Sequence, residues 1–270
     1  MYNLKYNLII LEEIMKKFGL IGNPLGHSFS PLIHKYLFEA KGLEATYELL
    51  ETTSSKLESR ISDLRLKKYD GYNVTIPYKI EIMKYLDEIS DEAKEIGSVN
   101  TICVKNGKVI GYNTDYYGFK RELEYYKIET TNKDAYVLGT GGASKAISKA
   151  LKDMKANVKL VSRHPVANMI GYEDLKNTNL DLIVNTTPVG MYPNVLASAL
   201  DVEVASKAKC IVDIIFNPVR TKLMSYNKNS YNGLLMLIFQ AAEAEDIWLD
   251  RVYDIDYDKI ISKVRGDIGE

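Results

Sequence analysis

A glycine-rich turn between a predicted strand and a predicted helix is the segment best suited to hold an anionic ligand. Residues 135–138 are typical of a strand, the turn reads Gly139-Thr140-Gly141-Gly142-Ala143, and residues 144–154 follow with helical spacing. Glycines let the backbone approach a pyrophosphate, and the helix directs unpaired N–H groups and a partial positive charge toward it. Because Ser144 replaces the third glycine of the full dinucleotide pattern, a tight turn without a ligand remains an alternative.

The end of the next predicted strand bears on which dinucleotide would bind. A site for NAD usually has Asp or Glu there to bind the ribose 2′-hydroxyl. This chain instead has Ser162-Arg163-His164, and no carboxylate occurs before Glu173. The planar guanidinium of Arg163 can pair with a 2′-phosphate, so we expect NADP, with a solvated surface arginine as the alternative.

Two serines lie immediately before another predicted helix. Ser28 and Ser30 are two residues apart, and Pro31 suits the first helical position, so we expect Ser30 to cap the helix. Both hydroxyls could also face the helix N-terminus, which favours a carboxylate. Lys79 and Asp115 follow later strands, and taken singly they are typical of a solvated lysine and a turn-forming aspartate. The residues alone do not bring this pair together.

Short β-type runs alternate with helical patterns along the whole chain, which indicates an α/β fold. We expect strands at 17–21, 46–50, 71–75, 98–104, 108–112, 135–138, 158–162, 182–185 and 210–214. We expect helices at 30–41, 56–66, 81–86, 117–126, 144–154 and 234–249. Asn106-Gly107 predicts a two-residue hairpin turn.

These elements divide into two predicted domains. The first spans residues 15–114 and the second, which contains the glycine turn, spans residues 115–232. We expect residues 233–270 to return to the first domain. Residues 1–14 are interpreted as an extension outside the fold, because Met15 opens a segment typical of a natural start.

Composition excludes several classes of protein. Among 270 residues, 46% are hydrophobic and 26% charged, as in a globular protein, and the longest apolar runs are too short to span a bilayer. With 35 basic and 36 acidic residues, no bulk positive charge exists to hold nucleic acid or an anionic membrane. Cys103 and Cys210 lie in apolar runs, which predicts buried free thiols and a cytoplasmic protein. The three scattered histidines do not suggest a metal site.

Short motifs in both halves of the chain share their order and spacing with one enzyme family. They are Gly22-Asn23-Pro24, His27–Pro31, Asn73–Lys79, Gly97–Thr101, Asn113-Thr114-Asp115, Gly139–Ser144, Asn185–Pro188, Asn217-Pro218 and Gly233…Gln240. Together they resemble shikimate dehydrogenase. The resemblance implies an N-terminal α/β substrate domain, a Rossmann-like NADP-binding domain, and a ligand in the cleft between them. The family reversibly reduces 3-dehydroshikimate to shikimate with NADPH, in aromatic amino-acid biosynthesis.

The resemblance also implies roles for individual residues. Lys79 and Asp115 match the catalytic dyad, and Ser28 and Ser30 match the pair that binds the substrate carboxylate. The positions that contact the ring hydroxyls are Thr75, Lys79, Asn100, Asp115 and Gln240. The expected cofactor-binding residues are Gly139, Thr140, Gly141, Gly142, Ala143, Ser144, Ser162, Arg163, Ile214 and Gly233. The expected partners are the small-molecule substrate and NADP, without nucleic acid or membrane, in a monomer or homodimer.

The chain departs from the family pattern in two places. Phe216 stands where the family usually has a tyrosine whose hydroxyl helps to hold the substrate carboxylate. The segment 164–181 is short, so we expect one crossover of the nucleotide domain to be reduced to a loop. Ser162 and His164 replace the family's Asn and Thr, which predicts fewer NADP contacts. A quinate/shikimate or aminoshikimate dehydrogenase and a catalytically weak NADP-binding paralogue with a regulatory role are the alternatives.

Overall fold

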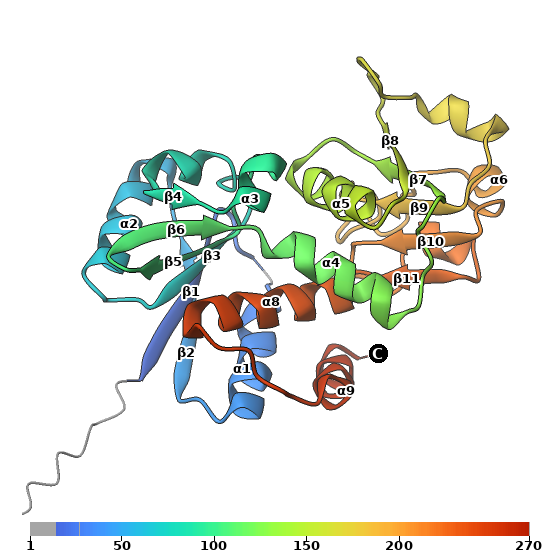
Figure 1. Ribbon diagram of the computed structural model, residues 1–270. Coiled ribbons are helices and arrows are strands. Elements are labelled where there is room, and N and C mark those ends of the chain that lie inside the picture. Colours follow the sequence, from blue (N-terminus) through green and yellow to red (C-terminus); the bar gives the residue numbers. More distant parts are fainter. Residues whose placement is uncertain (1–14, 27, 270) are drawn as a thin grey trace, which may run out of the picture.

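A computed structural model of the chain describes residues 15–26 and 28–269, so the predicted extension at 1–14 and His27 lie outside the described residues. The described part contains two β-sheets, each flanked by helices (Figure 1). This arrangement confirms the predicted α/β class. Within the described residues, no helix combines the length and apolar character needed to cross a bilayer.

The first sheet has six strands in the order β2-β1-β3-β5-β6-β4. Their bounds are β1 Lys16–Gly22, β2 Ala45–Glu51, β3 Gly71–Val74, β4 Glu88–Ile89, β5 Thr101–Lys105 and β6 Lys108–Tyr112. β1 pairs in parallel with β2 and β3, whereas β5 is antiparallel to both β3 and β6. The strands β1, β3 and β6 therefore run in the same direction, and their carboxyl ends meet at one edge of the sheet.

The helices of this first unit are short. They are α1 (Ser30–Lys41), α2 (Leu57–Arg65), α3 (Asp91–Ile96) and the 3₁₀ helices η1 (Ser54–Lys56) and η2 (Glu81–Tyr85). Residues 81–85 are helical, as expected, in the form of a 3₁₀ helix. The structure corrects one expectation, because Ser30 is the first helical residue of α1 rather than its cap. Phe29 occupies the cap position, and the Ser28 hydroxyl accepts a hydrogen bond from the Ser30 amide at 3.2 Å.

The second sheet has five parallel strands in the order β11-β10-β9-β7-β8. Its strands are β7 Asp134–Leu138, β8 Asn157–Val161, β9 Leu182–Asn185, β10 Cys210–Asp213 and β11 Ser230–Asn232. The helices of this unit are α5 (Gly142–Asp153), α6 (Val202–Ala205) and α7 (Lys222–Ser225). The crossover from β8 to β9 contains only the 3₁₀ helix η3 (Tyr172–Asn177), so it is reduced as expected. The chain passes to opposite sides of β7, which makes the carboxyl ends of β7 and β9 a topological switch point.

Two long helices lie between the sheets. α4 (Thr114–Tyr125) packs against α8 (Leu234–Leu249), and α8 also packs against α1 and α9 (Tyr257–Ile268) (Figure 1). The two helices cross closely at Gly118, where an added Cβ would lie 2.6 Å from the backbone oxygen of Met236. Only glycine fits this crossing. It brings the start of α4 beside the middle of α8.

The far end of α8 meets the first sheet through the chain's single tryptophan. The Trp248 ring stacks on Phe18 of β1 with the ring centroids 4.5 Å apart, and its indole nitrogen donates to the Ile102 carbonyl at 3.2 Å. Both cysteines are free and buried, as expected. Burial raises the pKa of Cys103 to about 11 and that of Cys210 to about 12, so both remain neutral thiols.

Candidate active site

Lys79 and Asp115 form an ion pair at the common edge of the first sheet. Lys79 lies in the turn after β3, and Asp115 lies in the first turn of α4, directly after β6. Because these two strands are parallel, the residues that follow them meet, and Lys79 Nζ lies 2.6 Å from Asp115 Oδ2. Their side chains are 18% and 10% exposed, so the pair is largely shielded but reachable. Asn113 caps α4 by accepting a hydrogen bond from the Tyr116 amide.

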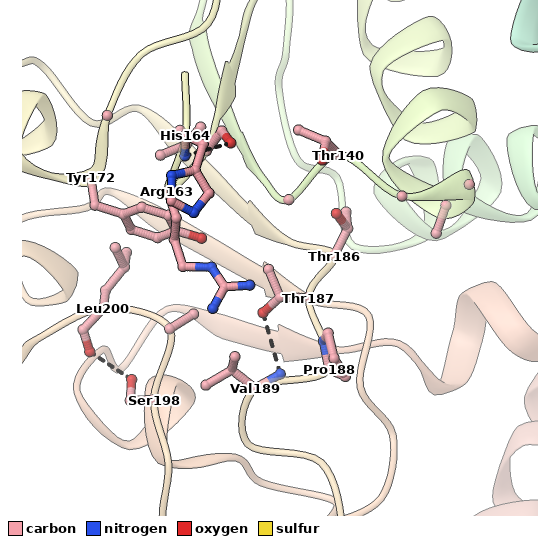
Figure 2. Close-up of a pocket in the computed structure, with 18 of the residues that line it drawn as sticks. Thr140, Arg163, His164, Tyr172, Thr186, Thr187, Pro188, Val189, Ser198 and Leu200 are labelled. Atoms are coloured by element: carbon pink, nitrogen blue, oxygen red, sulfur yellow. Dashed lines mark hydrogen bonds between the residues drawn. The ribbon is translucent and has the colours of Figure 1, made fainter. Parts of the chain in front are cut away.

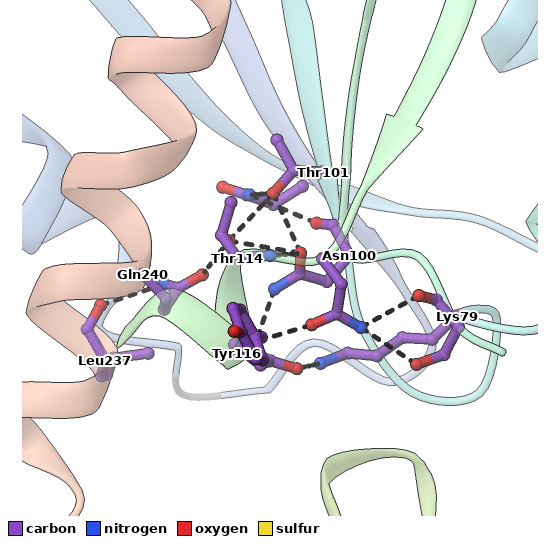
Figure 3. A network of polar contacts seen from close by, with 11 residues as sticks. Lys79, Asn100, Thr101, Thr114, Tyr116, Leu237 and Gln240 are labelled. Carbon is purple, nitrogen blue, oxygen red and sulfur yellow. Dashed lines mark hydrogen bonds and ion pairs between the residues drawn. The ribbon is translucent and has the colours of Figure 1, made fainter. Parts of the chain in front are cut away.

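Asn100 holds the other oxygen of the aspartate. Its Nδ2 donates to Asp115 Oδ1 at 2.9 Å, while its Oδ1 accepts from the Thr114 amide at 2.7 Å (Figure 3). The Thr114 hydroxyl in turn donates to Gln240 Oε1 at 3.3 Å. The expected substrate residues Asn100 and Gln240, from different elements, are thus joined to the Lys79–Asp115 pair through one hydrogen-bond network.

The serine pair lies beyond the end of β1, at the same sheet edge. An added Cβ at Gly22, the last residue of β1, would lie 2.6 Å from Thr75 Cγ2, which places the ends of β1 and β3 side by side. Phe216 contacts Phe29, between the two serines, in an edge-to-face arrangement with the ring centroids 5.7 Å apart. The aromatic ring at this position is therefore beside the predicted carboxylate site, but it carries no hydroxyl.

A cavity of about 1400 Å³ is lined by both units. Thr75 and Lys79 contribute from the first unit, and the expected cofactor residues Gly139–Ala143, Ser162 and Arg163 contribute from the second. Figure 2 shows two of them, Thr140 and Arg163. The cavity lies at the carboxyl ends of β7 and β9, where ligands bind in open α/β sheets. Lys79 and the glycine turn therefore face one space.

The glycine turn has the shape that a dinucleotide needs. Gly139 adopts φ +104°, and an added Cβ there would lie 3.0 Å from Thr186 Oγ1, so a side chain is excluded. At Gly141 and Gly142 an added Cβ would meet nothing within 4 Å, which leaves open space above the turn. α5 begins at Gly142 without a side-chain cap, so its first amides are available to an anion. These residues fit a pyrophosphate.

Three expected cofactor residues do not line the cavity. Ser144 is buried, and its hydroxyl donates to the Gly141 carbonyl at 2.6 Å, so it shapes the turn from behind. Ile214 and Gly233 lie against each other, and an added Cβ at Gly233 would lie 2.2 Å from the Ile214 oxygen. The segments that contain Ile214 and Gly233 approach so closely that only glycine fits at position 233.

The cavity also includes residues that the sequence analysis did not single out. Tyr172 and Lys176 line it from η3, and Leu200 lines it from the loop before α6. Burial raises the pKa of Tyr172, and the nearby positive charge of Arg163 partly opposes that rise, so the ring and the guanidinium lie close together (Figure 2). No periodic pattern marks Tyr172, because the segment around it is irregular.

A buried carboxylate supports the opposite wall. Asp213, at the end of β10, accepts hydrogen bonds from Asn185 Nδ2 at 2.9 Å and from the Thr221 hydroxyl at 2.7 Å. Desolvation raises its pKa to about 6 despite these donors. Asn185 Oδ1 then accepts from the hydroxyl of Thr187, a cavity residue, at 2.7 Å. Among the described residues, no group of three or more His, Cys, Asp or Glu side chains could hold a metal ion.

Known proteins match this chain over almost its full length. The family model for the shikimate dehydrogenase substrate binding domain matches residues 20–102. The shikimate dehydrogenase (NADP(+)) of Clostridium perfringens is 42% identical over 250 residues, which are 87% of this chain and 92% of that protein.

Solved structures give the same result. A chorismate mutase/shikimate 5-dehydrogenase fusion protein from Clostridium acetobutylicum superposes with a TM-score of 0.91 at 40% identity, covering 95% of this chain and 99% of that one. The shikimate 5-dehydrogenase of Thermus thermophilus, in complex with NADP(H) and shikimate, superposes with a TM-score of 0.83 at 30% identity, covering 93% of this chain and 99% of that one. From the sequence identity, the coverage and the shared fold, the chain belongs to the shikimate dehydrogenase family.

Proposed function

We propose that this protein catalyses the reversible, NADPH-dependent reduction of 3-dehydroshikimate to shikimate. The observation that carries the proposal is the Lys79–Asp115 ion pair, 2.6 Å long, whose lysine lines the same cavity as the glycine turn. The relatives named shikimate dehydrogenase and the Thermus enzyme, which holds NADP(H) and shikimate, support the same assignment.

The residues divide the chemistry between them. NADPH, when bound, supplies the hydride. As the hydride reaches the carbonyl carbon, negative charge develops on the carbonyl oxygen, and the Lys79 ammonium stabilises that charge and delivers the proton. Asp115 holds the ammonium in place, and Asn100 holds Asp115. In the reverse direction neutral Lys79 accepts the hydroxyl proton.

The remaining site residues bind the two ligands. We assign Ser28 and Ser30 to the substrate carboxylate, and Thr75, Asn100 and Gln240 to the ring hydroxyls. The turn Gly139–Ala143, shaped by Ser144, holds the pyrophosphate, and Ser162 and Arg163 hold the 2′-phosphate. Ile214 and Gly233 complete the cofactor site from the side of α8.

The two sheets correspond to two domains in this proposal. Residues 15–114, with 233–270, form the substrate-binding domain, and residues 115–232 form the dinucleotide-binding domain. The partners are the small-molecule substrate and NADP, with no nucleic acid, in a monomer or homodimer. The two free, buried thiols suit a reducing compartment, and we propose the cytoplasm.

A spectrophotometric assay of NADP⁺ reduction tests the proposal. We expect turnover with shikimate, and a higher kcat/KM for shikimate than for quinate. A higher value for quinate would favour a quinate/shikimate dehydrogenase. Tight NADP⁺ binding without turnover of either compound would favour the regulatory paralogue and overturn the enzymatic assignment.

A further inference from the structure

A buried ionic cluster joins α1 to α8. Glu245 of α8 and His34 of α1 have fully buried side chains, and Glu245 Oε1 lies 2.7 Å from His34 Nδ1. Lys41 Nζ lies 3.2 Å from Glu245 Oε2 and 2.6 Å from Asp246 Oδ1. A buried carboxylate beside a buried imidazole is costly unless each holds the other in a defined geometry.

The neighbours of Asn73 indicate a hydrogen on His34 Nε2. Asn73 Nδ2 lies 3.3 Å from the backbone oxygen of Asn100, which can only accept, so the amide nitrogen must point there. Asn73 Oδ1 then faces His34 Nε2 at 3.2 Å, and Nε2 must carry a hydrogen. The Tyr47 hydroxyl donates to the same oxygen at 2.8 Å.

Both imidazole nitrogens therefore face side-chain oxygen atoms, those of Glu245 and Asn73. The 2.7 Å contact between His34 Nδ1 and Glu245 Oε1 is a hydrogen bond between two fully buried side chains. Glu245 is the group that keeps the ring in the orientation that directs Nε2–H at Asn73.

A series of hydrogen bonds leads from Asn73 to the Lys79–Asp115 pair, and at each step the residue nearer Asn73 is the donor. Asn73 Nδ2 donates to the Thr101 hydroxyl at 3.1 Å, and that hydroxyl donates to Asn100 Oδ1 at 3.1 Å (Figure 3). Asn100 Nδ2 donates to Asp115 Oδ1 at 2.9 Å, and Asp115 holds Lys79. Each link in this chain is a donor paired with an acceptor.

We propose that Glu245 and His34 are positioning residues, which act through Asn73, Thr101 and Asn100 to orient the Asp115 carboxylate. The inference rests on the proposed dehydrogenase function. Because the Thr114 amide also donates to Asn100 Oδ1, the Glu245–His34 cluster is one of several groups that hold Asn100 in place. Loss of one hydrogen bond of ordinary strength predicts a fall in kcat of roughly three- to tenfold.

The variants are chosen to remove or keep the hydrogen bond between His34 and Asn73 without creating a cavity in the core. His34→Phe keeps a ring that can stack on Tyr47, whose centroid lies 4.0 Å from that of His34, but it removes the donor. Glu245→Leu removes the group that holds the ring, whereas Glu245→Gln keeps an amide that can hydrogen-bond to Nδ1 as donor or acceptor. Asp246→Asn is the matched control, because it alters the same cluster without contacting His34. The double variant His34→Phe/Glu245→Leu replaces the buried pair with apolar side chains, which often preserves folding.

We measure kcat, KM and the pH–rate profile for shikimate oxidation, with thermal unfolding as the check of folding. We expect His34→Phe and Glu245→Leu to lower kcat three- to tenfold and to change the pH–rate profile. We expect Glu245→Gln and Asp246→Asn to remain within about twofold of the unmodified protein. The double variant should lose no more than His34→Phe, because both residues act through one link.

Two results would overturn the inference. One is an unchanged kcat and pH–rate profile in folded His34→Phe. If the single variants do not fold, the same result in the folded double variant would overturn the inference, and so would the same result in Thr101→Val, which breaks the series of hydrogen bonds at another link. The other is an equal loss in Asp246→Asn, which would indicate a general structural effect. Absence of shikimate oxidation by the unmodified protein would instead refute the proposed function.

Discussion

At the scale of residues, an ammonium and a carboxylate are useful only where water is scarce but substrate can enter. The Lys79–Asp115 pair meets both conditions, because its side chains are 18% and 10% exposed and the lysine faces the large cavity. The neighbouring Lys84–Glu81 pair on η2 has 57% and 31% exposed side chains, and such pairs contribute little. The two lysines are close in sequence but differ in environment.

Replacement of Lys79 by alanine removes the proposed general acid. We expect kcat to fall by roughly 10²–10⁴-fold, the usual contribution of a positioned acid, while NADP⁺ affinity is retained. Steady-state kinetics and a cofactor titration measure the two effects. Lys84→Ala is the control and should behave like the unmodified protein. Near-normal turnover in Lys79→Ala would remove this residue from the mechanism.

Phe216 offers a gain-of-contact test. Its ring already lies against Phe29, beside the serine pair, so Phe216→Tyr adds a hydroxyl there without new bulk in the core. One added hydrogen bond is worth about 1 kcal/mol, which predicts a roughly fivefold lower KM for shikimate. An unchanged or higher KM would mean that the carboxylate binds elsewhere.

Glu122 of α4 is buried between α4 and α8, and burial raises its pKa well above the ordinary value. A carboxyl group whose pKa is raised by folding stabilises the protein only while it is protonated, so stability falls as the pH rises above about 4.5, the ordinary value. We therefore expect Glu122→Met to stabilise the protein at pH 8 more than at pH 5. Urea unfolding at both pH values measures this, with the exposed Glu124→Met as control. An equal effect at both pH values would contradict the assignment.

At the scale of elements, the crossing of α4 and α8 determines the geometry of the site. Asp115 lies in the first turn of α4 and Gln240 in the middle of α8, and the two helices approach most closely at Gly118. This close approach allows the Thr114 hydroxyl to reach Gln240. The crossing of the two helices therefore couples their packing to the hydrogen-bond network around Lys79 and Asp115.

Alanine substitutions at two helical glycines should have opposite effects. Gly118→Ala places a Cβ 2.6 Å from the Met236 oxygen and should lower the free energy of unfolding by about 1–3 kcal/mol, with a loss of kcat. Gly266→Ala in α9 meets nothing within 4 Å and should raise it by about 0.5–1 kcal/mol through helix propensity. Chemical denaturation measures both. Equal changes would mean that Gly118 is not a packing constraint.

Helices and strands could be predicted from the sequence because the spacing of hydrophobic residues and the choice of turn residues are local properties. The parallel strands around the glycine turn, the Asn106-Gly107 hairpin and the span of α8 match the expectations. The prediction that Ser30 caps α1 was wrong, because Ser30 is already helical and its amide donates to the Ser28 hydroxyl, outside the helix. The Lys79–Asp115 contact and the Glu245–His34 cluster could not be derived from the residues alone, because each depends on how distant segments pack.

At the scale of the whole molecule, the cavity draws its walls from both sheets, so a ligand that fills it binds only the folded chain. At 100 times its Kd, NADP⁺ should stabilise the fold by about 2.7 kcal/mol, a rise in Tm of roughly 5–10 °C. NAD⁺ at the same concentration should have a much smaller effect, since it lacks the 2′-phosphate for which we propose Arg163 as the partner. In Arg163→Ala the two cofactors should become equal in thermal-shift measurements, while shikimate binding is unchanged. A persistent NADP⁺ preference would assign the selectivity to another residue.

Trp248 stacks on Phe18 at the junction of α8 and β1 and is the only indole in the chain. Its intrinsic fluorescence therefore reports on one place in the molecule. Emission would follow detachment of α8 from the first sheet, whereas the second sheet, which has no tryptophan, would contribute no tryptophan signal. Compared with circular dichroism, which averages over both sheets, this native chromophore distinguishes sequential from concerted unfolding without any label.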